Sequence, residues 1–435
     1  MTNRYPRFCL LTALLSASLA ATSVAAQTVG KPALKYNDMS DNTGVIKAVE
    51  NGDSEALLAL EKSPPSPLIA MFAKAARARI GMDFQASTAA ANQCIEESQK
   101  QKNMVQELAC SLLKAGNELL LDHPGEWARQ LNAMRNKFYP LLRQSQGPSF
   151  ALSDLEKLPD YAPFLQVKDD VAIEGNSGAP WSLGIHVLKK GPLNPVSTIE
   201  PMAVEVRAGE TRFDAVLDTG GLMSLLNTPT AEALGIHAVP HWISTGSGDS
   251  GLGTVPSLSI GQVNLRNVPV AVASSGIPNV IGLSTLRQLG QVTFSSKLIV
   301  VGADAPPRCQ THPLVMRSTL IGTGPKLIVP IQVNGRPVRA VLDTGFTGVL
   351  DQYGTDNPDE LNGKVEQTMQ ITAQGPVAST YVVKSKQIGL GEASQQVAVR
   401  VRAAKSGVIY VAGLKLLDGT SAYIDFNRRV MCFGG

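Results

Sequence analysis

The residues best suited to chemistry lie in a hexapeptide that occurs twice, "AVLDTG" at residues 215–220 and again at residues 340–345. One Asp-Thr-Gly arises by chance in roughly one chain in twenty of this length, whereas two identical hexapeptides point to a duplication. If Asp218 and Asp343 meet, both cannot ionise at close range, and the pair holds a single proton. Such a pair can activate water: one carboxylate takes a proton from the water as it attacks a peptide carbonyl, and the protonated carboxyl supports the oxyanion.

The residues around each aspartate fit this task. Thr219 and Thr344 supply hydroxyls that can form hydrogen bonds between the two loops. Gly220 and Gly345 let backbone N–H groups approach the carboxylates, because glycine has no side chain to hold them away.

The duplication extends beyond the hexapeptides. Each copy follows a hairpin-like segment, "VEVRAGETRFD" before the first and "VPIQVNGRPVR" before the second. Each copy is also followed by an apolar segment closed by glycine and then by a short helical segment, in "NVIGLSTLRQLGQVTF" and in "IYVAGLKLLDGTSAYIDF". The sequence therefore predicts two homologous halves of one β-rich unit.

These halves resemble the retropepsin-like aspartic proteases, joined in one chain as in the two-lobed pepsin-like enzymes, over roughly residues 171–435. The resemblance implies that Asp218 and Asp343 are catalytic and that a peptide binds as an extended strand between the lobes. It implies that Gly282 and Gly413 complete a ψ-shaped crossing of strands beside each catalytic loop. It also implies that neither a cofactor nor a metal is needed.

The sequence departs from the family directly after both Asp-Thr-Gly motifs. Family members continue with Ala or Ser and then Ser or Thr, whereas this chain continues with Gly221-Leu222 and with Phe346-Thr347. A hydroxyl that would bind the outer oxygen of each aspartate is missing at the first position of both copies. Because a lost hydrogen bond disfavours the ionised form, we expect a raised aspartate pKa and a weakly acidic to neutral working pH.

The stretch "GSGDSG" at residues 246–251 contains both G-D-S-G, found around serine-protease nucleophiles, and G-x-G-x-x-G, the dinucleotide fingerprint. The dinucleotide motif requires a helix after it, but "LGTVPSLSIGQVNL" is strand-like. The serine-protease motif requires a histidine and an aspartate in suitable settings upstream, which this chain lacks. By analogy with the family, the stretch is instead the mobile flap over the substrate. We expect the flap to comprise Trp242, Thr245, Gly246, Ser247 and Gly248, with Trp242 or Thr245 in contact with substrate.

A second flap-like segment, "ITAQGPVAS" around Gly375, is expected to be the stiffer of the two because it contains Pro376. A zinc site is not expected at His237 and His241, since Pro240 breaks any helix there and no His-Glu-x-x-His pattern is present.

The elements that must position this site fall into successive segments. Residues 1–26 resemble a signal peptide, with Arg4 and Arg7 before an apolar stretch and with small residues before the cleavage site after Ala26. The composition predicts a mixed, multidomain chain: an all-α helical-hairpin (TPR-like) domain and then two mostly antiparallel β acid-protease lobes. The expected bounds are 27–168 for a helical domain of four or five helices, 169–303 for the first lobe, 304–325 for a connector and 326–435 for the second lobe.

Four cysteines remain after cleavage of the signal peptide, which is an even number for an oxidising compartment. We favour Cys94 with Cys110 and Cys309 with Cys432, although four buried thiols are an alternative. In two-lobed relatives the last two regions meet in a sheet between the lobes, so that bridge would tie the lobes together.

Composition restricts the partners. The chain has 435 residues and a net charge of +3, with 44% hydrophobic content and no basic run, so nucleic-acid binding is not expected. After Ala26 no segment approaches the roughly 20 apolar residues that cross a bilayer, so we expect a periplasmic or secreted protein without stable membrane insertion.

The sequence leads to one preferred function, an exported aspartic endopeptidase acting on peptides or proteins. One alternative is a catalytically impaired peptide-binding module whose helical domain recruits a protein partner. A second alternative is an enzyme that stays latent until its N-terminal region is removed.

Overall fold

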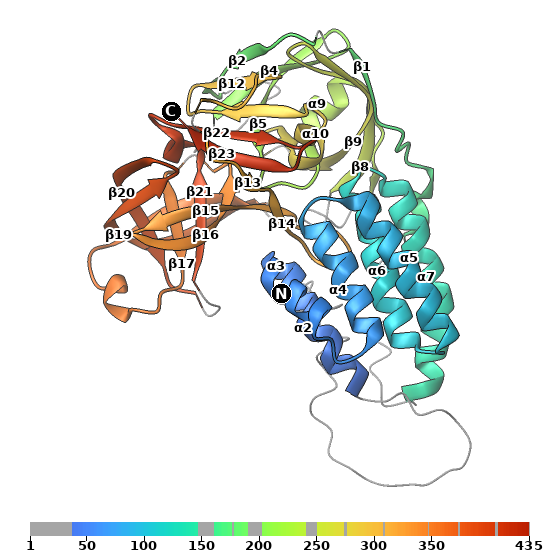
Figure 1. Cartoon of the computed structure of the whole chain (residues 1–435). Coiled ribbons are helices and arrows are strands. Elements are labelled where there is room, and N and C mark those ends of the chain that lie inside the picture. The colour runs from blue at the N-terminus through green and yellow to red at the C-terminus, as the bar shows by residue number, and fades with distance from the viewer. Residues whose placement is uncertain are drawn as a thin grey trace, which may run out of the picture.

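The computed structural model describes residues 37–146, 161–175, 178–189, 202–240, 250–273, 276–307, 309–346, 348–372, 375–404 and 408–434. A helical region precedes a β-rich region made of three sheets, which agrees with the predicted mixed class (Figure 1). The expected leader, residues 1–26, lies outside the described residues.

Six helices form the described part of the helical region, where composition indicated four or five. They are α2 (Asn37–Asn51), α3 (Ser54–Lys62), α4 (Pro67–Ile80), α5 (Phe84–Lys100), α6 (Met104–Leu120) and α7 (Pro124–Gln146). They run side by side as a layer of hairpins (Figure 1). A 3₁₀ turn, η2 (Ala162–Gln166), packs against α7.

Short turns with a shared backbone conformation reverse the chain between most neighbouring helices. At four of the five connections a residue with positive φ lies just after one helix, and the next residue but one begins the following helix. Between α4 and α5 the reversal is made by Met82, at φ 59°, and Asp83 then accepts a hydrogen bond from the Ala86 amide at 3.1 Å. Between α5 and α6, Lys102 and Asn103 do the same. The side-chain cap satisfies an N–H group that the first helical turn would otherwise leave free.

The first β-unit is a barrel-like sheet built from residues 172–282. Its strand order is β1-β9-β6-β10-β5-β4-β8-β7, β8 also pairs with β9, and β3 pairs with β4. The strands are β1 (Ala172–Gly175), β3 (His186–Val187), β4 (Met202–Ala208), β5 (Thr211–Asp218), β6 (Ser224–Asn227), β7 (Val239–Pro240), β8 (Gly251–Ile260), β9 (Val263–Ala273) and β10 (Val280–Gly282). The short helices α9 (Thr228–Ala233) and α10 (Leu283–Arg287) follow β6 and β10.

The second β-unit, residues 315–413, repeats this arrangement. Its strand order is β14-β15-β16-β21-β17-β20-β19-β18, and β15 also pairs with β19. The strands are β14 (Val315–Arg317), β15 (Lys326–Val333), β16 (Arg336–Asp343), β17 (Leu350–Tyr353), β18 (Val365–Thr372), β19 (Gly375–Leu390), β20 (Ala393–Arg402) and β21 (Ile409–Gly413), with 3₁₀ turns η3 (Pro358–Leu361) and η4 (Leu414–Leu417).

Equivalent strands pair in the same sense in both β-units. The hairpin β4–β5 corresponds to β15–β16, and β10 runs parallel to β5 as β21 does to β16. The two hairpins predicted before the Asp-Thr-Gly motifs are therefore confirmed.

A third, six-stranded sheet takes strands from the start of the β-rich region, from the segment between the two β-units and from its end. Its order is β13-β23-β22-β11-β12-β2, formed by β2 (Trp181–Gly184), β11 (Gln291–Phe294), β12 (Leu298–Val301), β13 (His312–Pro313), β22 (Ser421–Asp425) and β23 (Val430–Gly434). It lies between the two β-units (Figure 1). Because β11 pairs with β22, the strand that follows the first unit is joined to the strand that follows the second.

Both favoured disulfides are present. Cys94–Cys110 links α5 to α6, and Cys309–Cys432 joins the segment before β13 to β23. The second bridge closes a loop with a sequence separation of 123 residues. A crosslink over such a loop restricts the unfolded chain by about 4 to 5 kcal/mol in the chain-entropy account.

We expect replacing Cys309 and Cys432 together by serine to lower the thermal midpoint by several degrees. Each Cα keeps its place in the fold, so the loss arises mainly in the unfolded chain. Thermal unfolding followed by circular dichroism measures it. A double variant that melts at the wild-type temperature would show that the bridge adds nothing to stability.

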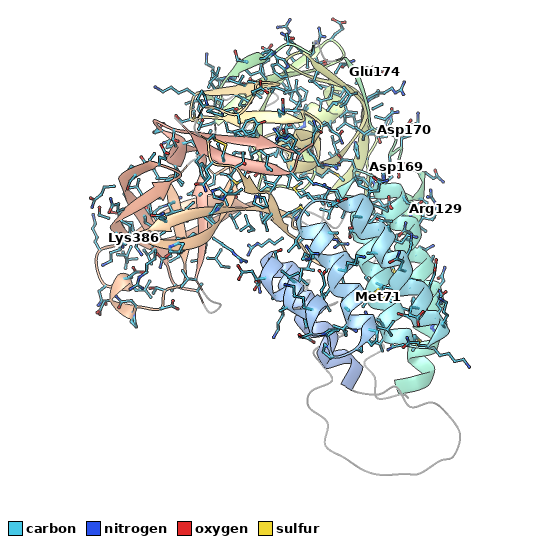
Figure 2. All side chains as sticks on the ribbon, viewed as in Figure 1. Met71, Arg129, Asp169, Asp170, Glu174 and Lys386 are labelled. Atoms are coloured by element: carbon cyan, nitrogen blue, oxygen red, sulfur yellow. A yellow bond between two sulfur atoms is a disulfide. The ribbon has the colours of Figure 1, made fainter. Side chains whose placement is uncertain are left out.

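The helical region packs directly against the β-rich region. The loop at residues 318–325, between β14 and β15, carries many of these contacts, and Gly52 packs on Val315 and Ile328. At the other end of the interface Asp169 accepts a hydrogen bond from the Glu126 amide at 2.9 Å, at the junction visible in Figure 2. Within the described residues, no helix is both long and apolar enough to cross a membrane.

Candidate active site

Each aspartate ends the inner strand of its β-unit. Asp218 is the last residue of β5, where it pairs in parallel register with Gly282 of β10. Asp343 is the last residue of β16, where it pairs in the same way with Gly413 of β21. The two Asp-Thr-Gly motifs are therefore presented by equivalent turns.

A buried hydrogen-bond network joins the two turns through their threonines. The Thr219 amide donates to Thr344 Oγ1 at 3.0 Å, and the Thr344 amide donates to Thr219 Oγ1 at 3.1 Å. The hydroxyls in turn donate across the interface, Thr219 to the Leu342 carbonyl at 2.8 Å and Thr344 to the Leu217 carbonyl at 2.6 Å. Since both threonines are almost fully buried, this symmetric network fixes one loop against the other.

The glycines of the motifs bring the carboxyl groups together. A Cβ on Gly220 would lie 2.6 Å from Cγ of Asp343, and a Cβ on Gly345 would lie 2.7 Å from Cγ of Asp218. Each glycine thus packs on the aspartate of the other β-unit, and only a residue without a side chain leaves that space free. The two carboxyl groups are close enough for the charge of Asp218 to act on Asp343.

Backbone amides hold one oxygen of each carboxyl group. The Gly220 amide donates to Asp218 Oδ1 at 2.7 Å. On the other side the donor to Asp343 Oδ1 is the amide of Phe346, at 3.0 Å. As whole residues, both aspartates are half-buried.

Burial, the leading cause, and the neighbouring charge of Asp218 together raise the pKa of Asp343 to about 7. The positive charge of Lys326 and the Phe346 amide act in the opposite sense. The direction agrees with the shift expected from the sequence. The leading cause differs from the expected one, because it is desolvation, followed by the charge of the second carboxylate.

The structure gives a reason for the departure at Gly221. A Cβ at this position would lie 2.8 Å from Asp218 Oδ2, so a serine could not be added without moving the carboxylate. In the second unit the equivalent Phe346 packs its ring under the Arg400 guanidinium, 4.8 Å from the ring centroid.

Gly282 and Gly413 pack against the backbone of the loop that follows the Asp-Thr-Gly motif in their own β-unit. A Cβ on Gly282 would lie 2.5 Å from the Met223 carbonyl oxygen, and one on Gly413 would lie 2.3 Å from the Gly348 carbonyl oxygen. The residue after each glycine also bonds to this loop. The Leu283 amide donates to the Gly221 carbonyl oxygen at 2.8 Å, and the Leu414 amide donates to the Phe346 carbonyl oxygen at 2.9 Å. These glycines therefore support the loops that carry the aspartates.

The sequence interpretation missed Lys326, the first residue of β15. Its ammonium donates to the carbonyl oxygen of Gly220, the residue that packs on Asp343. The sequence held a signal for it, because the two repeats differ at this position. The two motifs lie 125 residues apart, and at that offset a lysine, Lys326, stands in the second repeat where the first has Pro201.

The expected flap lies outside the described residues, which include none of Trp242, Thr245, Gly246, Ser247 and Gly248. The strands on either side, β7 and β8, pair antiparallel, Val239 with Leu252. In the second unit β18 and β19 form a corresponding hairpin. His237 is exposed and His241 is not described, and the described part of the chain holds no group of three side chains suited to a metal.

Comparisons with known proteins bear on this geometry. Residues 204–285 match the family described as "Aspartyl protease", a segment that includes Asp218 and ends just after Gly282. A solved retropepsin-like aspartic protease from Rickettsia conorii is similar at 14% sequence identity and a TM-score of 0.23, over 30% of this chain and 93% of that one. Among curated proteins, none matches the sequence.

Proposed function

We propose that this chain, which is related to the retropepsin-like aspartic proteases through residues 204–285, is an aspartic endopeptidase with Asp218 and Asp343 as its catalytic pair. The observation that carries the proposal is the placement of both carboxyl groups at one point by two equivalent strand ends and a shared threonine network. On this account the two β-units are the two lobes of the protease.

The proposed reaction is hydrolysis of a peptide bond by a water held between the carboxyl groups. The pair shares one proton, and we assign it to Asp343 because burial and the charge of Asp218 raise the pKa of that carboxyl. Asp218 takes a proton from the water as the water oxygen attacks the carbonyl carbon, while the Asp343 proton supports the developing oxyanion. Asp218 then passes the proton that it took from the water to the amine nitrogen, and the C–N bond breaks to give a carboxylic acid and an amine.

This assignment predicts the basic limb of the pH–rate profile. Below pH 7 Asp343 keeps the proton that the mechanism requires. Above pH 7 it loses this proton, so activity should fall about tenfold per pH unit. Initial rates on one peptide from pH 3 to pH 9 measure the limb. An optimum near pH 2 would contradict it.

Incubation with a peptide library, with products identified by mass spectrometry, tests the function itself. Cleavage by the wild-type chain supports the endopeptidase. Retention of library peptides without any cleavage would instead support the impaired binding module that the sequence left open.

Export is part of the proposal. It is supported by the leader-like residues 1–26 and by two disulfides, which form in oxidising compartments such as the periplasm or the extracellular space. We likewise propose peptides or proteins as substrates and the helical region as a surface for a protein partner, with no cofactor required.

A further inference from the structure

The loop between β14 and β15, residues 318–325, is held by the helical region along its backbone. Arg79 of α4 is fully buried and donates to the carbonyl oxygens of Thr319 at 3.2 Å and Leu320 at 2.7 Å. Trp127 of α7 donates from Nε1 to the next carbonyl oxygen, that of Ile321, at 3.0 Å. Three successive carbonyl groups of the loop thus accept hydrogen bonds from two different helices.

Glycines allow the loop and α6 to touch. A Cβ on Gly116 would lie 2.5 Å from the Leu320 carbonyl oxygen and 2.6 Å from the Gly322 amide nitrogen. Both atoms belong to the backbone, so neither can swing away as a side chain could. The position of the loop is therefore set by direct contact with the helix.

The same loop leads straight to the aspartate pair. Pro325 is buried in a small apolar cavity whose other walls include Met82 and Phe84 from the helical region and Leu222 and Leu283 from the first β-unit. The next residue is Lys326, whose ammonium donates to Gly220. The helical region, the loop and the catalytic turn of the first unit thus form one continuous contact.

We propose that Lys326 is a positioning residue that supplies one positive charge to the edge of the aspartate pair, and that the helical region holds it there through the loop at residues 318–325. The inference rests on the proposed peptidase function. On this inference the helical region is required for activity, so it does not act as an inhibitor that keeps the enzyme latent.

The groups around Lys326 define what its charge can act on. The positive charge of Lys326 acts on Asp343, and Arg317 stands opposite Lys326 on β14. Beyond Pro325 the cavity is bordered by Arg287, whose charge interacts with that of Asp122. The positive charge of Lys326 offsets the repulsion between two ionised carboxylates and so lowers the pKa of Asp343. Its loss should therefore favour the protonated form of Asp343.

The test is the basic limb of the pH–rate profile in Lys326→Met and Lys326→Arg. Lys326→Met should move the limb upward by about one pH unit, because the proton of Asp343 is then harder to remove. Lys326→Arg keeps the charge and should keep the wild-type limb. A Lys326→Met profile that is lower at every pH but unmoved would overturn the inference, since a merely structural role has that result.

Two glycine variants test the part played by the helical region. Gly116→Ala forces α6 and the loop apart and should move the limb in the same direction as Lys326→Met. Gly44→Ala is the matched control, since its Cβ would meet only Leu60 Cδ1 at 3.8 Å, and it should keep the wild-type limb. A wild-type limb in a folded Gly116→Ala variant, checked by circular dichroism, would overturn this part.

A readout without turnover separates this inference from the proposed function. Carbon-13 NMR of labelled aspartate carboxyl groups, with Asp343→Asn to assign the signal, follows the titration of Asp343 directly. An upward move of that titration in Lys326→Met supports the inference even if no peptide is cleaved. An unchanged titration overturns it whatever the peptidase assay shows.

Discussion

Asp218→Asn should lower kcat/KM for peptide cleavage by about 10³-fold or more while leaving the fold intact, because it removes the group that takes the proton from water. Asparagine has nearly the shape of aspartate, and its carbonyl oxygen can still accept the 2.7 Å hydrogen bond from the Gly220 amide. The threonine network does not involve the carboxyl group, so the two turns should stay joined. Initial rates on a peptide substrate, beside thermal unfolding, measure both effects.

Asp214→Asn is the matched control, since Asp214 lies on the same strand, β5. Its carboxylate interacts with His186 at 3.0 Å, on the other side of the hairpin from the catalytic turn. Its rates should stay within about twofold of wild type, because this partly exposed pair lies away from the reacting groups. Asp343→Asn should lose as much activity as Asp218→Asn. Full activity in either dyad variant would refute the shared mechanism.

Gly220→Ala should lower kcat/KM by about 10²-fold or more through the aspartate of the opposite β-unit. The new methyl group would stand 2.6 Å from Cγ of Asp343, which is far closer than two such atoms can approach, so the carboxyl group must move. A displacement of about 1 Å at a reacting group costs roughly that factor. Gly345→Ala should act in the same way on Asp218, where the corresponding distance is 2.7 Å.

Gly184→Ala controls for the general effect of adding a methyl group, because nothing lies within 4 Å of a Cβ at that position in β2. We expect wild-type rates and a wild-type thermal midpoint for it. The distinguishing result is a fall in rate for the two motif glycines without an equal fall in stability. Unchanged rates in Gly220→Ala would mean that the carboxyl groups do not lie as described.

The centre of the site could be predicted because duplication leaves a local record in the sequence. Two identical hexapeptides imply two equivalent turns, and two equivalent turns imply that Asp218 and Asp343 occupy related positions. The hairpins before the motifs also follow from local alternation of apolar and polar residues. Gly282 and Gly413 could be found because the apolar segment before each of them is repeated as well.

The rest of the site depends on contacts between segments far apart in the chain. Arg79 meets Thr319 and Leu320 across more than two hundred residues, and no pattern near either end announces it. Lys326 was overlooked for a different reason, since it breaks the duplication that guided the search. In the second β-unit a buried ion pair joins Arg402 to Asp351 at 2.8 Å, where the first unit has the apolar Leu225 at the matching register position.

The most direct measurement of the central claim is a crystal structure of the protein with a statine-type inhibitor, whose hydroxyl stands in for the attacking water. We predict that this hydroxyl lies within about 3.2 Å of carboxyl oxygens from both Asp218 and Asp343. A structure in which the hydroxyl contacts neither carboxyl group, or in which the two aspartates point apart, would contradict the account.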